Sequence, residues 1–141
     1  MSSPAPPVGV HHVALQVRDL SVMEAFYREV LGLSVLRRWP AADGHGDRSI
    51  WLDLGGHGFL ALELVPGDPA DDAHLESSWL TERAGLHLLA LGISPASRAD
   101  WLAHLTAAHV PIAHHTPYTI YVLDPEGNRV GLSHWPDEAT A

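Results

Sequence analysis

The chain of 141 residues contains no cysteine. That absence excludes disulfide bonds, cysteine-ligated zinc and thiol catalysis, and it leaves the redox compartment open. The sequence also has no apolar run long enough to span a membrane. Its opening residues, MSSPAPPVGV, lack both the basic region and the apolar core of a secretory signal. We therefore expect a cytoplasmic protein.

Positive charge is scarce, with 8 Lys and Arg against 17 Asp and Glu, which gives a formal net charge of −9. That balance argues against nucleic acid or an anionic membrane as a partner and leaves a small molecule as the expected ligand. A hydrophobic content of 46% is ordinary for a globular protein. The 11 histidines hint at metal chemistry, but histidine-rich surfaces are common, so their number alone decides nothing.

The stretch from Val10 to Leu36 organises the first half of the chain. Residues Val10 to Val17 alternate, which predicts a strand with two different faces. Its apolar face suits a core and its opposite face suits a cavity wall, because the latter carries only His12, Ala14 and Gln16.

A helix is predicted next. Asp19 and Ser21 supply helix-start chemistry, and Gly32 falls where a C-terminal cap belongs. Between them, apolar residues recur at helical spacing: Met23, Phe26, Tyr27, Val30 and Leu31. A strand to Leu36 and two more at 49–54 and 59–65, joined by a Gly-rich hairpin signal, complete the order strand, helix, three strands.

The second half repeats that order. A strand is predicted over 85–93, a helix from Ser94-Pro95, and strands over 110–114, 118–123 and 128–135, the last two joined by a turn at 124–127. The sequence therefore predicts an α+β fold of two tandem βαβββ modules whose mixed sheets curl around a central cavity. We place the modules at 10–65 and 85–136, a linker at 66–84, and loose tails at 1–9 and 137–141.

Three residues of this repeat could carry chemistry. Glu63 lies between Ala61 and Val65, where a carboxylate is costly unless it is paired, metal-bound or at an exposed edge. His12 and His87 each lie near the start of a module's first strand. A single histidine there is usually just hydrogen-bonded, but related positions in both repeats favour a shared site.

The sequence resembles the vicinal oxygen chelate superfamily, which includes glyoxalase I, extradiol dioxygenases, fosfomycin-resistance enzymes and bleomycin-binding proteins. The resemblance runs from about Val10 to Pro136 and is carried by HHVALQVRDL, AFYREVLGL, IWLDLG, LHLLALGI and IYVLDPEGNRVGL. In that family the two sheets surround a metal held by the first and last strand of each module.

Carried over by position, the resemblance implies His12, Glu63 and His87 as ligands of a divalent transition metal: Fe, Mn, Ni, Co or Zn. The fourth family position, usually glutamate, falls on Gly131, which cannot ligate. The absent glutamate argues against a glyoxalase I or fosfomycin transferase reaction, since both use it.

Two functions remain open at this stage. One is a metal-dependent enzyme, dioxygenase-like or lyase-like, in which the ion acts as a Lewis acid on an oxygen-chelating substrate. The other is a metal-free protein that sequesters a drug, as in bleomycin resistance. Trp51 and Tyr121 are candidates for contact with substrate, and Tyr121 and His115 for catalysis, although a strand aromatic or a solvated histidine is equally ordinary. Family members of this length usually pair, so we expect a homodimer.

Overall fold

The protein is described by a computed structural model that covers residues 4–65, 79–80 and 84–139. Most of the predicted linker therefore lies outside the described residues. The first module contains β1 (His12–Val17), α1 (Leu20–Ala25) continued by the π-helical turn η1 (Phe26–Val30), β2 (Val35–Pro40), β3 (Asp47–Asp53) and β4 (Phe59–Leu64). The second contains β5 (Leu89–Gly92), a 3-10 turn (Pro95–Ser97), α2 (Arg98–Ala107), β6 (His114–His115), β7 (Thr119–Leu123) and β8 (Arg129–Ser133).

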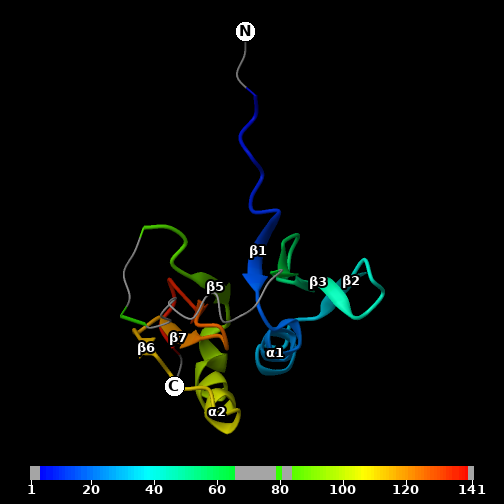
Figure 1. The fold of residues 1–141 in the computed structure, drawn as a ribbon. Coiled ribbons are helices and arrows are strands. Elements are labelled where there is room, and N and C mark those ends of the chain that lie inside the picture. The colour runs from blue at the N-terminus through cyan, green and yellow to red at the C-terminus, as the bar shows by residue number, and fades with distance from the viewer. Residues whose placement is uncertain (1–3, 66–78, 81–83, 140–141) are drawn as a thin grey trace.

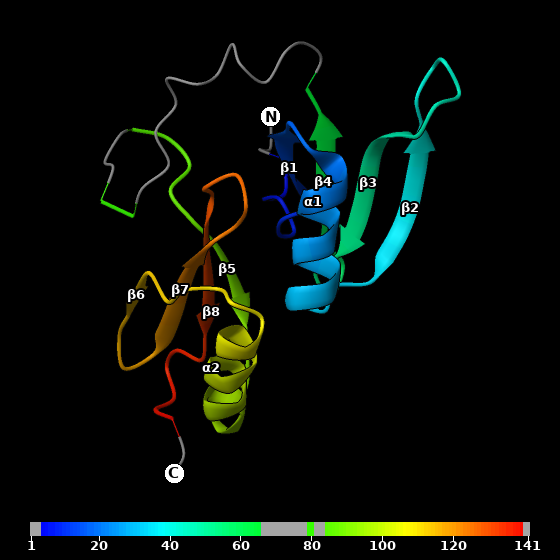
Figure 2. The same cartoon turned by 60° about the horizontal axis from the view of Figure 1, so that its bottom comes forward.

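Each module forms one four-stranded mixed sheet. The strand orders are β1-β4-β3-β2 and β5-β8-β7-β6. In both sheets the first strand runs parallel to the last, and the remaining pairs are antiparallel. The predicted α+β fold of two βαβββ modules is confirmed. The two sheets lie side by side and do not close into a barrel (Figure 2).

The local signals of the first helix act as predicted. The side chain of Asp19 accepts a hydrogen bond from the backbone N–H of Val22 at 3.0 Å, which satisfies one of the free donors at the helix start. Gly32 has a φ of 79°, a left-handed conformation that only glycine adopts cheaply. The helix therefore stops there and the chain turns back into β2.

Two predicted strands of the second module are shorter than the sequence suggests. The strand predicted from Gly85 begins at Leu89, and the strand predicted over 110–114 is reduced to His114–His115. Pro111 has no N–H to donate to a ladder, which explains the late start of β6. The predicted turn at 124–127 is present, with Gly127 N–H donating to the carbonyl of Asp124 at 2.9 Å.

Both helices cover the same side of the sheets. In Figure 1, α1 and α2 lie below the strands, so the uncovered sheet faces point toward the top of the view. The covered faces form the core; its fully buried side chains include Met23, Tyr27, Leu52, Leu62, Leu105, Ile120, Val122 and Leu132. The alternation of each strand thus places one set of side chains under a helix and the other on an open face.

Side chains, rather than strand pairing, join the two modules. The Tyr27 hydroxyl donates to the carboxylate of Asp124 at 2.7 Å. The carboxylate of Glu126 accepts from the backbone N–H groups of Arg18 and Asp19, each at 2.9 Å. The turn between β7 and β8 therefore docks on the first module's strand-to-helix corner.

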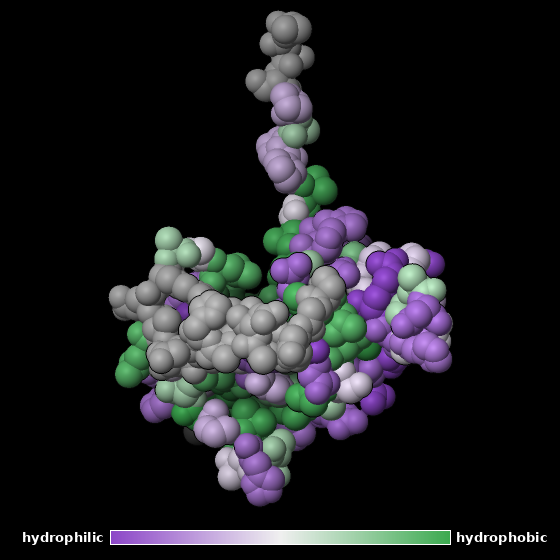
Figure 3. Space-filling model, in the orientation of Figure 1, coloured by the Kyte–Doolittle hydropathy of each residue, from purple (hydrophilic) through white to green (hydrophobic). Residues whose placement is uncertain are grey.

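The N-terminal segment extends away from the body as an arm (Figure 3). Hydrophobic residues lie near its base, where Val8 and Val10 are exposed. None of the helices in the described residues combines the length and the apolar character that a bilayer crossing requires.

Candidate ligand-binding site

The open face of the first sheet is defined by its strand register. His12 lies beside Phe59, Ala14 beside Ala61, and Gln16 beside Glu63 across the β1–β4 pair. Across the β3–β4 pair, Trp51 lies beside Ala61 and Ser49 beside Glu63. Residues that face one another across a ladder share a side of the sheet. Trp39 lies beside Ser49 across the β2–β3 pair. We call this surface the first open face; it carries His12, Ala14, Gln16, Trp39, Ser49, Trp51, Phe59, Ala61 and Glu63.

Four aromatic rings run in series across the first open face. The ring of His12 stacks on Phe59, with centroids 4.7 Å apart and planes 6° apart. Phe59 stacks on Trp51 at 4.4 Å and 24°, and Trp51 meets Trp39 edge-on at 5.3 Å. The guanidinium of Arg37 lies 3.7 Å above the Trp39 ring. Because stacked rings turn their faces to one another, the series presents mainly ring edges and leaves ring faces free only toward its ends. It forms an apolar surface against which a flat molecule can pack.

Two polar atoms on this side of the sheet are buried among their neighbours. The hydroxyl of Ser49 and the indole N–H of Trp39 are buried and have no hydrogen-bond partner within the described part of the chain. Ser49 is 1% exposed and lies opposite both Trp39 and Glu63 in the register. Burying an unpaired polar group is costly, so the sheet holds unused hydrogen-bonding capacity next to Glu63.

The open face of the second sheet has the same layout. Asp53 pairs with Phe59 and Leu123 pairs with Arg129 at the ends of two hairpins of equal length. Residues at the same distance from these pairs correspond to each other. Tyr121 therefore corresponds to Trp51 on the third strand of each module. On the last strand, Arg129 corresponds to Phe59, Gly131 to Ala61 and Ser133 to Glu63. On the first strands Ala90 corresponds to Ala14, because each pairs with the corresponding residue of the last strand. We call the surface of Leu88, Ala90, Tyr121, Arg129 and Gly131 the second open face.

Leu88, rather than His87, corresponds to His12. Each lies two residues before the paired alanine, Ala90 or Ala14. A Cβ placed on Gly131 would lie 3.5 Å from Leu88 Cδ1 and 3.5 Å from Tyr121 Cδ1. Gly131 therefore faces the same side as both. His87 precedes Leu88 and lies outside β5.

The predicted ligands do not meet. Glu63 lies four residues along β4 from the partner of His12, a separation of about 13 Å at the rise of a strand. The Nδ1 of His87 instead accepts a hydrogen bond from the Arg129 guanidinium at 3.3 Å. Among the residues that the structure describes, no three His, Asp or Glu side chains lie close enough together to hold a metal ion.

The strand register shows which residues occupy the positions that could supply metal ligands. Glu63 corresponds to Ser133, and the family's glutamate position, Gly131, corresponds to Ala61. Of the four equivalent positions His12, Ala61, Leu88 and Gly131, only His12 offers a ligand atom. The residues present therefore do not fit a divalent transition metal, which needs three or more such donors.

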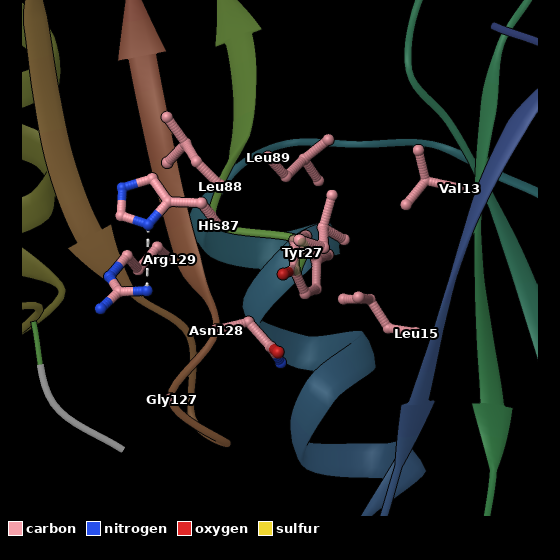
Figure 4. A pocket seen from close by; sticks show the side chains of 10 residues that line it. Val13, Leu15, Tyr27, His87, Leu88, Leu89, Gly127, Asn128 and Arg129 are labelled. Atoms are coloured by element: carbon pink, nitrogen blue, oxygen red, sulfur yellow. Dashed lines mark hydrogen bonds between the residues drawn. The ribbon is translucent and has the colours of Figure 1, made fainter. Parts of the chain in front are cut away.

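A small cavity of about 110 Å³ separates the two modules. Figure 4 shows Val13 and Leu15 reaching in from β1, Tyr27 from the helix, and His87 beside Arg129 on the opposite side. The Tyr27 hydroxyl is turned to Asp124. The cavity is large enough for a few water molecules and continues toward the second open face through Leu88 and Arg129.

The other predicted site residues lie as follows. Trp51 and Tyr121 are half-buried and occupy corresponding positions on the two open faces. His115 is exposed in β6 and pairs with Ile120, one step away from the row of Tyr121. His114, not His115, lies against Tyr121, with ring centroids 5.7 Å apart.

Sequence reasoning missed Trp79 and Arg129. The Trp79 ring packs on His114 at 5.3 Å and 20°, and on Tyr121 at 4.9 Å. Its carbonyl accepts from Arg129 at 3.1 Å. Trp79 lies within the acidic segment 66–84 that is predicted to be a linker, and the weak periodicity of that segment gives no reason to single it out. Arg129 could have been found, because it alternates with Gly131 on the last strand.

The perturbed acids lie outside the open faces. Burial raises the pKa of Asp124, although hydrogen bonds from Tyr27, Asn128 and Glu126 act in the opposite direction. Burial also raises the pKa of Tyr27, and the negative charge of Asp124 adds to the effect. The hydrogen-bonded Arg38 guanidinium lowers the pKa of Glu24. These groups stabilise the fold and the module junction rather than the candidate site.

Two tandem βαβββ modules, each with a helix on one side and an open sheet face on the other, define a class of small two-module proteins. The model of the Glyoxalase/Bleomycin resistance protein/Dioxygenase superfamily matches residues 9–132. The chain belongs to this superfamily, as its resemblance predicted.

Solved structures agree with that fold. A glyoxalase/dioxygenase from Nostoc punctiforme is 23% identical with a TM-score of 0.74, covering 97% of this chain and 99% of its own. A lactoylglutathione lyase from Agrobacterium tumefaciens is 23% identical with a TM-score of 0.65, covering 94% and 100%. TnmS3, an antibiotic binding protein from Streptomyces sp. CB03234, is 22% identical with a TM-score of 0.63, covering 93% and 98%. No curated protein matches the sequence.

Proposed function

We propose that this protein binds a flat, mainly apolar small molecule on its open sheet faces without a resident metal ion. The observation that carries the proposal is the series of rings Trp39, Trp51, Phe59 and His12 on the first open face. Stacked aromatic side chains favour planar ligands and contribute about 0.5–1.5 kcal/mol per ring pair beyond simple burial. TnmS3, an antibiotic binding protein, has the same fold, so a binding role is compatible with it.

The residues at the family's ligand positions support the same proposal. Ala61, Leu88 and Gly131 are apolar, and a metal-dependent reaction would lack the donors that fix the ion and offset its charge. These three residues place no polar side-chain atom on the open faces, and they leave room beside the rings for a ligand. A ligand held there gains burial and stacking without displacing a hydrated ion.

The metal-dependent enzyme of dioxygenase or lyase type is the second candidate. One observation favours it: His12 offers an imidazole on the first open face. Glu63 lies about 13 Å from that position along the sheet and cannot share an ion with it, so substrate oxygens would have to complete the coordination of an ion held by His12.

One set of measurements separates the two candidates. Protein purified without a metal-affinity tag is analysed for metal content, and its binding to a panel of planar aromatic compounds is measured by calorimetry. We expect no stoichiometric metal and saturable binding of at least one compound. Trp51→Ala should weaken that binding about tenfold, the equivalent of about 1.4 kcal/mol.

Trp135→Ala is the matched control, because Trp135 is 70% exposed in the C-terminal segment and lies outside both open faces. Its binding should equal that of the wild type. About one equivalent of transition metal per chain, lost in His12→Ala, would instead establish the metal-dependent candidate. Equal binding by the Trp51 and Trp135 variants would refute the first open face as the site.

A further inference from the structure

The second open face already holds a flat ring, and that ring belongs to the protein itself. Trp79 lies outside the two sheets in the chain and packs across Tyr121 and His114. Its near-parallel contact with His114, at 20° and 5.3 Å, is the geometry of a stacked pair. The guanidinium carbon of Arg129 lies 5.6 Å from the centre of the Trp79 ring, within reach of a cation–π contact.

The internal repeat shows which residues of the first open face correspond to the residues that Trp79 contacts. Tyr121 and Arg129 correspond to Trp51 and Phe59, the two central members of the first ring series. Trp79 therefore lies on the second open face where a bound ring would lie on the first. Its position shows which groups of the second face recognise such a ring.

Trp79 also satisfies a polar contact on this face. Its backbone carbonyl accepts a hydrogen bond from Arg129 Nη2 at 3.1 Å, next to the stacked ring. A second guanidinium nitrogen of Arg129 donates to His87 Nδ1 at 3.3 Å, which orients the guanidinium plane. Guanidinium donors bind carboxylates more strongly than neutral carbonyls because the hydrogen bonds are charge-assisted.

From this arrangement we infer that the second open face is a ring-binding subsite in which Trp79 takes the place of a ligand. The ligand class is a flat aromatic ring that carries a carboxylate or a carbonyl a few bonds from the ring. The ring takes the position of the Trp79 indole against His114 and Tyr121, and the oxygen takes the position of the Trp79 carbonyl at Arg129. The inference rests on the proposed binding function and specifies its ligand.

The occupied face makes Trp79 a competitor of the ligand. The apparent affinity of a face that is covered for most of the time equals its intrinsic affinity multiplied by the fraction of time for which the face is free. If Trp79 covers it about nine-tenths of the time, removal of the indole tightens binding about tenfold.

Indole-3-acetate and 3-methylindole test the inference, because they share a ring and differ in the carboxylate. Dissociation constants are measured by calorimetry on the full chain for the wild type, Trp79→Ala, Trp135→Ala and Trp79→Ala/Arg129→Gln. We expect Trp79→Ala to bind indole-3-acetate about tenfold more tightly than the wild type and to prefer it to 3-methylindole. Trp135→Ala should match the wild type, and the added Arg129→Gln should abolish the preference for the carboxylate.

A direct readout comes from the five indole N–H signals in a nitrogen-edited NMR spectrum, assigned by single Trp substitutions. Indole-3-acetate should move the Trp79 signal of the wild type toward that of a solvent-exposed tryptophan and leave the Trp135 signal in place. The inference is overturned if Trp79→Ala binds indole-3-acetate no more tightly than the wild type, or if the preference survives Arg129→Gln. If the inference fails while Trp51→Ala still weakens binding of the planar panel, the proposed function stands; if no variant binds any planar compound, both fail.

Discussion

Leu88 and Gly131 lie next to each other on the second open face, where a Cβ on Gly131 would be 3.5 Å from Leu88 Cδ1. By register these are the positions at which a metal-binding relative would present its second-module donors. Gly131 has no positive φ, so a side chain there meets no backbone strain. The nearest neighbour of that Cβ would be Thr119 Cγ2 at 3.3 Å, which needs to shift only slightly.

The first prediction builds donors at these two positions. Leu88→His combined with Gly131→Glu places an imidazole and a carboxylate on one face, so Co²⁺ affinity should rise by at least tenfold over the wild type. Cobalt titration followed by absorption spectroscopy measures the change. The control is Gly131→Glu with the native His87 and Leu88, which should gain much less. Equal affinity in the two variants would mean that His87 reaches the ion and that the register is not the deciding factor.

The second prediction concerns the hydrogen bond from Tyr27 to Asp124. Tyr27→Phe removes a donor to a buried carboxylate and should lower the free energy of unfolding by about 1.5–3 kcal/mol at neutral pH. Urea unfolding at pH 7 and near pH 4 measures the effect. The loss should be smaller at the lower pH, because a protonated Asp124 accepts a weaker hydrogen bond than an ionised one.

The pH dependence of Asp124 itself has a defined sign. Its pKa is raised in the folded protein by burial, so the folded state binds this proton more tightly than the unfolded chain does. The stability contributed by Asp124 is therefore greatest below the ordinary pKa of aspartate and declines as the pH rises through the raised value. Asp124→Asn should remove this component. If Tyr27→Phe, made with Asp124 unchanged, lowered the free energy of unfolding equally at pH 7 and near pH 4, the ionisation of Asp124 would not affect this hydrogen bond. That result would contradict the prediction.

The third prediction concerns the junction of the modules at Glu126. Its carboxylate accepts from the amides of Arg18 and Asp19, so Glu126→Gln should leave these amides less protected. Hydrogen exchange should speed up about tenfold or more at Arg18 and Asp19, in line with the loss of a charge-assisted hydrogen bond. Glu138→Gln, in the exposed C-terminal segment, is the control and should leave both rates unchanged. Unaltered exchange in Glu126→Gln would show that the contact contributes nothing to the junction.

The fourth prediction concerns assembly. Two-fold pairing is the commonest form of oligomer, and this chain exposes the apolar residues Val10, Leu64 and Leu86. We expect a homodimer at micromolar concentration, measured by sedimentation velocity. A monomer at that concentration would contradict the prediction.

The sequence by itself determined the elements and their repetition. Asp19 and Gly32 define the ends of the first helical segment, Ser94-Pro95 starts the second, and the turn at Asp124 joins β7 to β8, because caps and turns depend on local chemistry. Two copies of the same order of elements then predicted the two-module fold. Alternation in β1 also predicted that His12 faces away from the core, since its neighbours Val13 and Leu15 are apolar.

Only the tertiary structure decided which residues meet on the open faces. The segment around His87 is apolar at odd and even positions alike, so alternation could not choose its face, and a shift of one residue exchanges the two faces. The hairpin register in turn set Glu63 opposite Ser49 and matched it with Ser133 rather than Gly131. The contact of Trp79 with Tyr121 joins residues far apart in the chain and depends on packing, which no local pattern encodes.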